Sequence, residues 1–114
     1  MADYHHTKEY RIWRAKIIRR DKKCLVCDSM SKRVAHHINS ASYFKDDMYK
    51  IENGVCLCER HHTMYHTSYN SSFRKKTDVK NFCNFLEMMI KIAEETGSYN
   101  KERMKEFKNY LEAD

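Results

Sequence analysis

Two pairs of potential metal ligands constrain this chain more than any other feature of its sequence. Cys24 and Cys27 are separated by two residues, and thirty residues further on Cys58 and His61 repeat that spacing. Each such turn presents two ligands on one side, and two turns complete the tetrahedral set of a structural Zn²⁺. A metal bound in this way would join the two ends of the intervening segment and contribute directly to folding.

The cysteines are better explained by metal binding than by disulfides. Their number, five, is odd, and the chain has neither a recognisable export signal nor an apolar stretch that could span a membrane. A soluble, cytoplasmic protein with reduced thiols is therefore expected. Cys56 is a rival ligand, because strand alternation would place it on the same face as Cys58. We prefer Cys58, which alone makes the two-residue step to His61, and expect Cys56 and Cys83 to be small core residues.

The spacing of apolar residues predicts a mixed α and β chain. At 114 residues a single domain, 1–114, is expected. Helices are predicted at 7–20, 59–69, 78–96 and 100–112, and strands at 34–38 and 54–58. The remaining segments are expected to be a frayed end at 1–6, a polar turn at 21–33, a long loop at 39–53 and a basic connector at 70–77. The core would span about 24–69, with a helical extension at about 78–113.

Four further histidines have a spacing that suits a second site. His36 and His37 are adjacent in a predicted strand, so their side chains point to opposite faces and imply two different tasks. His62 and His66 lie four residues apart on a predicted helix, within reach of a single ion. His61 lies about 100° around that helix from His62 and can face the zinc instead. The spacing thus permits two metal sites that share one helix.

This order of residues resembles the HNH nucleases, whose fold is also called ββα-metal or His-Me finger. The matching segments are Cys24-x2-Cys27, Ala35-His36-His37-Ile38, Glu52-Asn53-Gly54-Val55 and Leu57-Cys58-x2-His61-His62, with His66 one turn further on. The likeness covers about residues 24–66. It implies an α+β fold with a small ββα-metal core and structural zinc knuckles, flanked by an N-terminal helix and two C-terminal helices.

The resemblance also implies a role for each histidine. His37 would be the general base, and Asn53 would orient it through hydrogen bonds and tie down the loop between the strands. His36, His62 and His66 would hold the catalytic ion, with His62 as the last histidine of the motif. His36 stands where many members have Asp, and the zinc ligand His61 stands where many zinc-containing members have Cys.

The activity that the resemblance implies is hydrolysis of DNA phosphodiesters to 5′-phosphate and 3′-hydroxyl ends with one divalent ion. An all-imidazole ligand set favours Mn²⁺, Ni²⁺, Co²⁺ or Zn²⁺ over Mg²⁺, which prefers oxygen ligands. Small chains of this layout are similar to phage-encoded HNH enzymes, which include homing endonucleases and nucleases encoded beside DNA-packaging genes. The protein would act as a monomer or a homodimer.

The charge distribution is consistent with a nucleic-acid partner. The net charge is +6, and residues 1–33 carry ten Lys and Arg against four Asp and Glu, whereas residues 78–114 carry six against eight. Positive charge therefore accompanies the Cys/His segments, as suits a polyanion. The residues expected to contact DNA are Arg11, Arg14, Arg19, Arg20, Arg74, Lys75 and Lys76. Contacts to phosphate position a duplex without reading its sequence.

Two other functions remain open at the level of sequence. A zinc-dependent DNA-binding module without catalysis would explain the Cys/His pairs and the basic residues, but it gives no role to His37 and Asn53. A protein-interaction role would use the apolar face of the helix at 78–96 as an assembly surface, although such a face more often packs into a core.

Overall fold

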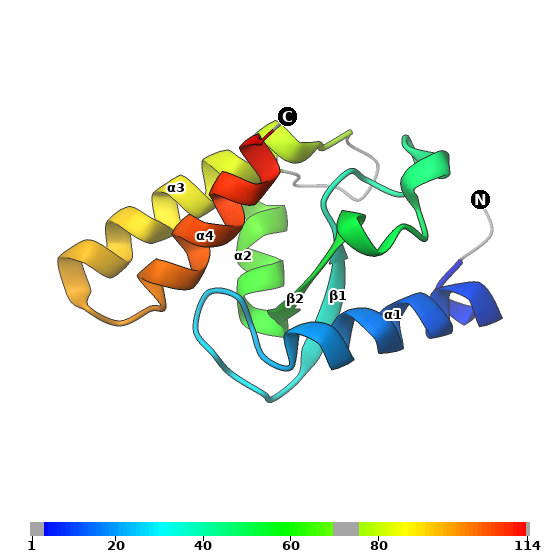
Figure 1. Cartoon of the computed structure of the whole chain (residues 1–114), viewed down its shortest axis with the longest axis horizontal. Coiled ribbons are helices and arrows are strands. Elements are labelled where there is room, and N and C mark those ends of the chain that lie inside the picture. Colours follow the sequence, from blue (N-terminus) through cyan, green and yellow to red (C-terminus); the bar gives the residue numbers. More distant parts are fainter. Residues whose placement is uncertain (1–3, 70–75, 114) are drawn as a thin grey trace.

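The computed structural model describes residues 4–69 and 76–113, which form four α-helices and a two-stranded sheet (Figure 1). The α-helices and strands are α1 (Lys8–Asp21), β1 (Arg33–His37), β2 (Gly54–Cys58), α2 (Glu59–Tyr69), α3 (Val79–Thr96) and α4 (Lys101–Glu112). Three short 3-10 turns, η1 (Tyr4–His6), η2 (Lys45–Asp47) and η3 (Ile51–Asn53), complete the described secondary structure. The α+β class predicted from the sequence is confirmed. No helix within the described residues combines the length and apolar character needed to cross a membrane.

The sheet lies between α1 and α2. Its strands are antiparallel, with Arg33 opposite Cys58 and His37 opposite Gly54. The helix α1 packs on one face of the sheet and α2 on the other, with α3 against α2 and α4 against α3 (Figure 1). Consecutive residues of β1 therefore face different helices, which separates the surroundings of His36 from those of His37.

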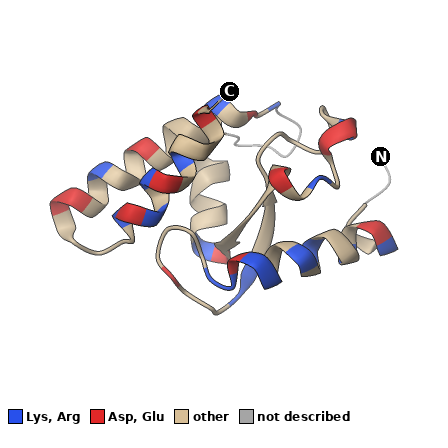
Figure 2. Ribbon diagram, in the orientation of Figure 1, with Lys and Arg blue, Asp and Glu red and all other residues tan. Residues whose placement is uncertain are grey.

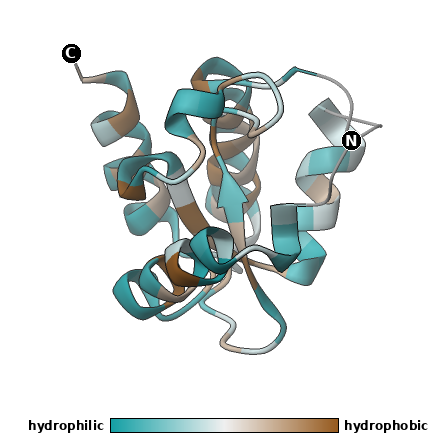
Figure 3. Ribbon diagram, turned by 90° about the vertical axis from the view of Figure 1, so that its right-hand side faces the viewer, coloured by the Kyte–Doolittle hydropathy of each residue, from teal (hydrophilic) through white to brown (hydrophobic). Residues whose placement is uncertain are grey.

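Two apolar clusters hold these layers together. The smaller one joins α1 to the sheet through Tyr10, Trp13, Ile17, Ala35 and Cys56. The larger one lies on the α2 side and takes in the apolar face of α3, namely Phe82, Phe85, Leu86, Met89 and Ala93. Apolar and hydrophilic residues alternate along the helices, as expected of helices that each bury one face (Figure 3). The face of α3 that could have served as an assembly surface is thus packed inside the chain.

Gly54 lets α1 approach the sheet closely. A Cβ atom at this position would lie 2.5 Å from the side chain of Ile17 and 2.6 Å from that of Trp13. Such distances are far inside van der Waals contact, so only glycine fits unless the side chains of Ile17 and Trp13 shift. Packing against α1 therefore explains why glycine follows Asn53, and only the three-dimensional structure shows it.

The helix ends follow the expected chemistry. Asp78 caps α3 in a capping box with Asn81, and Gly97 ends the helix in the left-handed region with φ of 69°. The predicted strand at 34–38 is shifted by one residue, and the predicted loop at 39–53 contains the two turns η2 and η3. Residues 70–75 of the predicted connector lie outside the described residues.

One expectation was wrong in the part that the structure describes. Residues 1–6 were predicted to be frayed, yet Tyr4–His6 form a 3-10 turn against α1, while residues 1–3 lie outside the described residues. The Thr7 hydroxyl donates a hydrogen bond to the Tyr4 carbonyl at 2.8 Å and accepts one from the Tyr10 amide at 3.1 Å. The ring of Tyr4 also meets Tyr10 edge to face, with centroids 5.5 Å apart. The helix cap and this aromatic contact together order the turn.

Candidate metal centres

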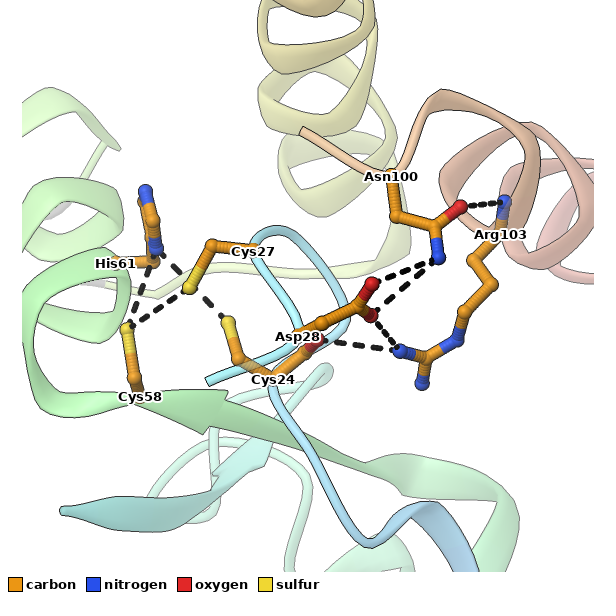
Figure 4. A network of polar contacts seen from close by, with 7 residues as sticks. All are labelled: Cys24, Cys27, Asp28, Cys58, His61, Asn100 and Arg103. Carbon is orange, nitrogen blue, oxygen red and sulfur yellow. Dashed lines mark hydrogen bonds and ion pairs between the residues drawn. The ribbon is translucent and has the colours of Figure 1, made fainter. Parts of the chain in front are cut away.

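The four predicted zinc ligands converge at one point (Figure 4). One ligand atom from each of Cys24, Cys27, Cys58 and His61 lies within 4.8 Å of all the others. The Cys27 and Cys58 sulfurs are 3.8 Å apart, and His61 Nδ1 lies 3.3 Å from the Cys58 sulfur and 3.9 Å from that of Cys24. With Zn–S bonds of about 2.3 Å and Zn–N bonds of about 2.0 Å, a tetrahedral site separates its ligand atoms by about 3.5 to 3.8 Å. These residues are therefore positioned to hold Zn²⁺.

Three separate elements supply these ligands. Cys24 and Cys27 lie in a tight turn after α1, which the Asp28 amide closes by donating to the Cys24 carbonyl at 3.0 Å. Cys58 ends β2, and His61 lies in the first turn of α2. Burial raises the pKa of the Cys24 thiol to about 12 and also raises that of Cys27. A divalent cation would offset this cost, because a coordinating thiol is deprotonated outright.

Cys56 is not part of this cluster. Its side chain packs with Tyr10, Trp13 and Ile17 on the α1 side of the sheet, and it is absent from both groups of converging ligand atoms in the described residues. Its amide donates to the Asp21 carboxylate at 2.9 Å. The sequence-based preference for Cys58 over Cys56 agrees with this geometry, and Cys83 is likewise a buried residue of α3.

A second group of nitrogens converges at His36, His62 and His66. One ring nitrogen from each lies within 4.8 Å of the other two, and the Nε2 atoms of His62 and His66 are 3.0 Å apart. Two nitrogens bound at about 2.1 Å to neighbouring positions of one ion, about 90° apart, would have this separation. His36 Nε2 is buried and has no hydrogen-bond partner among the described residues. The donor set thus fits a divalent ion that accepts imidazole ligands.

Burial keeps these rings neutral. It lowers the pKa of His36 well below the ordinary value of 6.5, lowers that of His62 to about 4, and lowers that of His66. The rings of Tyr65 and Phe82 pack near His36, with centroids 4.7 and 5.3 Å away. A neutral imidazole offers the lone pair that a metal requires, so near pH 7 the three rings are in the form that can bind one.

His37 has entirely different surroundings. Its ring is stacked on the indole of Trp13, with centroids 4.1 Å apart and planes 7° from parallel. Its Nε2 lies 2.9 Å from the Met48 carbonyl. A carbonyl can only accept, so Nε2 carries the proton and Nδ1 keeps the lone pair. Burial lowers the pKa of His37 to about 4, which leaves the ring unprotonated at pH 7.

Asn53 fixes the loop between the strands. Its side-chain oxygen accepts from the Asn39 amide at 2.8 Å, and its Nδ2 donates to the carbonyls of Asn39 and Asp47, each at 3.1 Å. We had expected its hydrogen bonds to orient the His37 ring as well. The ring instead donates from Nε2 to the Met48 carbonyl, one residue beyond Asp47.

One cavity is lined both by the group formed by His36, His62 and His66 and by His37. It has a volume of about 310 Å³ and includes His36, His37, His62 and His66 in its lining. Tyr4, His5 and Tyr10 line it from the side of α1, and Ser40, Ser42 and Thr77 line the remainder with Val34, Ala35 and Ala41. The η1 residues Tyr4 and His5 were not predicted here. Their ordering depends on aromatic contacts that no local sequence pattern indicates.

The residues expected to contact DNA divide into two groups. Lys and Arg are distributed along α1 (Figure 2), where Arg11, Arg14, Arg19 and Arg20 are all exposed. Arg14 donates to the Arg33 carbonyl at 2.9 Å. Arg20 pairs with Asp21 at 2.6 Å and donates to the carbonyls of Ile51 and Gly54. These two side chains thus also tie α1 to the sheet region.

The remaining basic residues follow α2. Lys76 is exposed, and its ammonium lies 5.1 Å from the centroid of the Phe44 ring. Arg74 and Lys75 lie outside the described residues.

Comparison of the chain with protein-family models, curated proteins and solved structures gave no match.

Proposed function

We propose that this protein is a metal-dependent DNA endonuclease of the HNH type, with β1, β2 and α2 as its ββα-metal core. One observation carries the proposal. Nitrogens of His36, His62 and His66 converge closely enough to share an ion, and His37, adjacent to His36 in the strand, lines the same cavity from the opposite face of the sheet. A zinc site alone would require none of these four residues.

The reaction needs an activated water and neutralisation of phosphate charge. His36, His62 and His66 would hold a divalent ion, which when bound would neutralise phosphate charge as a Lewis acid. His37 would supply the first, since its Nδ1 lone pair can take a proton from water while Nε2 remains hydrogen-bonded to Met48. Attack of that water would form a new bond from oxygen to phosphorus while the bond from phosphorus to the 3′ oxygen breaks. The departing 3′ oxygen would take up a proton from solvent, which gives 5′-phosphate and 3′-hydroxyl ends.

The support around His37 suits a positioned base. Trp13 fixes the plane of the ring, and the indole itself is held by donation from its Nε1 to the Lys50 carbonyl at 2.9 Å. Met48 and Lys50 belong to the loop that Asn53 fastens through Asp47. The same short loop therefore sets both the orientation and the tautomer of the ring. Orientation of this kind is what converts a nearby base into an effective one.

The proposal predicts cleavage of supercoiled plasmid with Mn²⁺ or Ni²⁺, visible as nicked or linear DNA on a gel. His62→Ala should remove cleavage while zinc content, measured by mass spectrometry of the native protein, stays at one ion. His6→Ala is the matched control, because His6 lies on η1 and belongs to neither converging group, and it should cleave like the wild type. DNA binding without cleavage under every divalent ion would instead indicate a zinc-dependent binding module.

Ion preference offers a second prediction. His36→Asp should raise the Mg²⁺-supported cleavage rate relative to the Mn²⁺-supported rate, because a carboxylate oxygen suits Mg²⁺ better than an imidazole nitrogen does. His36→Asn is the control, since Asn has nearly the same size as Asp but carries no charge. Plasmid cleavage rates in the two ions measure the effect. Equal Mg²⁺ dependence in the wild type and the Asp variant would show that His36 is not a ligand.

DNA binding should weaken steeply with added salt. The slope of log K against log salt is expected to be about −0.9 for each phosphate that the protein neutralises. Arg19→Ala should reduce the magnitude of that slope by about one, whereas Lys105→Ala, on α4, should leave it unchanged. Fluorescence anisotropy of a labelled duplex, titrated at several salt concentrations, measures both slopes. A flat salt response would exclude an electrostatic contact with DNA.

A further inference from the structure

The turn that presents Cys24 and Cys27, here called the zinc knuckle, is contacted by residues at the start of α4. The Asp28 carboxylate follows the second knuckle cysteine and accepts a hydrogen bond from Arg103 Nη1 at 2.7 Å and from Asn100 Nδ2 at 3.1 Å (Figure 4). The same Arg103 nitrogen donates to the carbonyl of the zinc ligand Cys24 at 3.2 Å. One guanidinium thus contacts both ends of the turn that presents Cys24 and Cys27.

Two further contacts join the same region to the middle of the knuckle and to the His61 ligand. The Asn100 amide donates to the Val26 carbonyl at 3.0 Å, in the middle of the knuckle. The ring of Tyr99 meets the His61 ring edge to face, with centroids 5.2 Å apart. The connection between α3 and α4 therefore contacts the knuckle and also the histidine ligand from α2, although it lies about forty residues beyond the last ligand in sequence.

The knuckle turn needs such support because its backbone is strained. Asp28 has φ of 62°, in the left-handed region that favours glycine. A residue other than glycine is seldom found there unless its surroundings hold it, although Asp tolerates this conformation better than most residues do. With the backbone in this conformation, the hydrogen bonds from Asn100 and Arg103 hold the Asp28 carboxylate in place.

We propose that Asp28, Asn100 and Arg103 form a latch that retains the zinc ion. For the ion to leave, Cys24 and Cys27 must move away from Cys58 and His61, and the latch opposes that movement. Both charged side chains are partly exposed, 29% for Arg103 and 38% for Asp28, so the ion pair itself adds little to global stability. Its main effect should be on the rate of zinc release. This inference does not depend on nuclease activity.

The test compares zinc release from the full chain into a chromogenic chelator. Arg103→Gln should release zinc about tenfold faster, which is the lower end of the effect of removing groups that support metal ligands. Lys105→Gln is the matched control, because Lys105 also forms an ion pair from α4, with Glu94 at 3.4 Å. That pair joins α4 to α3, away from the knuckle, so the control should release zinc at the wild-type rate.

A second variant separates the latch from backbone strain. Asp28→Gly relaxes the left-handed backbone but removes the carboxylate, so it should also release zinc faster, and combining it with Arg103→Gln should add little. Thermal unfolding of each zinc-loaded variant should stay close to that of the wild type. The latch is excluded if Arg103→Gln and Asp28→Gly both release zinc at the wild-type rate, or if Lys105→Gln accelerates release equally. A wild-type protein that contains no zinc would overturn the latch together with the site.

Discussion

Cys58→Ala is expected to abolish zinc binding and cooperative folding together. Metal binding to structural zinc sites supplies about 10 to 16 kcal/mol in small zinc-finger peptides, whereas a whole domain is usually stable by only about 5 to 15 kcal/mol. The site here joins the knuckle after α1, the end of β2 and the start of α2. Loss of one ligand therefore removes the link between these elements. The positions of His37 and of the group formed by His36, His62 and His66 depend on that link. Zinc stoichiometry and circular dichroism during thermal unfolding measure the two losses.

Cys56→Ala is the matched control for that experiment. Cys56 and Cys58 lie two residues apart in the same strand, and both are buried, so the two substitutions remove the same atoms from similar depth. Cys56 packs against α1 outside the zinc group, and its variant should retain one zinc and a cooperative transition. A Cys58 variant with full zinc content, or a Cys56 variant without zinc, would contradict the assignment of ligands.

The order and spacing of the cysteines and the histidine made their convergence at one point predictable from the sequence. Pairs at two-residue spacing can each contact one ion only on one side of a turn, so Cys24, Cys27, Cys58 and His61 required no knowledge of the fold. The alternation of strand side chains likewise predicted that His36 and His37 have different surroundings, because the period of a strand is two residues. Both are local rules, which a single sequence expresses directly.

The surroundings of His37 could not be predicted in the same way. Trp13 is buried on α1, but its stacking on a ring 24 residues away depends on how closely α1 approaches the sheet. At that approach the side chains of Ile17 and Trp13 occupy the space that a Cβ atom at position 54 would need, so the role of Gly54 is set by tertiary packing. The Met48 carbonyl is equally invisible in the sequence, since any residue offers one and only the path of the loop decides where it points. The order of η1 has the same tertiary origin.

His37→Ala should reduce the plasmid cleavage rate by about 10² to 10⁴, the usual contribution of a positioned general base. The low pKa of His37, about 4 because of burial, makes this ring unprotonated and able to accept a proton throughout the neutral range. Cleavage by the wild type should therefore persist as the pH falls below 6.5, where an ordinary histidine becomes protonated. Single-turnover rates between pH 5 and pH 8 measure the loss, and a wild-type rate that stays level across this range places the acid limb below it.

The alanine variant also offers a positive test of the role of this ring. Removing the imidazole leaves a space beside the Trp13 indole, so added imidazole should enter it and partly restore cleavage. Zinc content and DNA affinity should be unchanged, because the zinc ligands lie in a separate group and the phosphate contacts are expected from other residues. An alanine variant that cleaves at the wild-type rate would exclude His37 as the base. One that is inactive and unresponsive to imidazole, with altered zinc content, would assign the ring to the packing of α1 on the sheet.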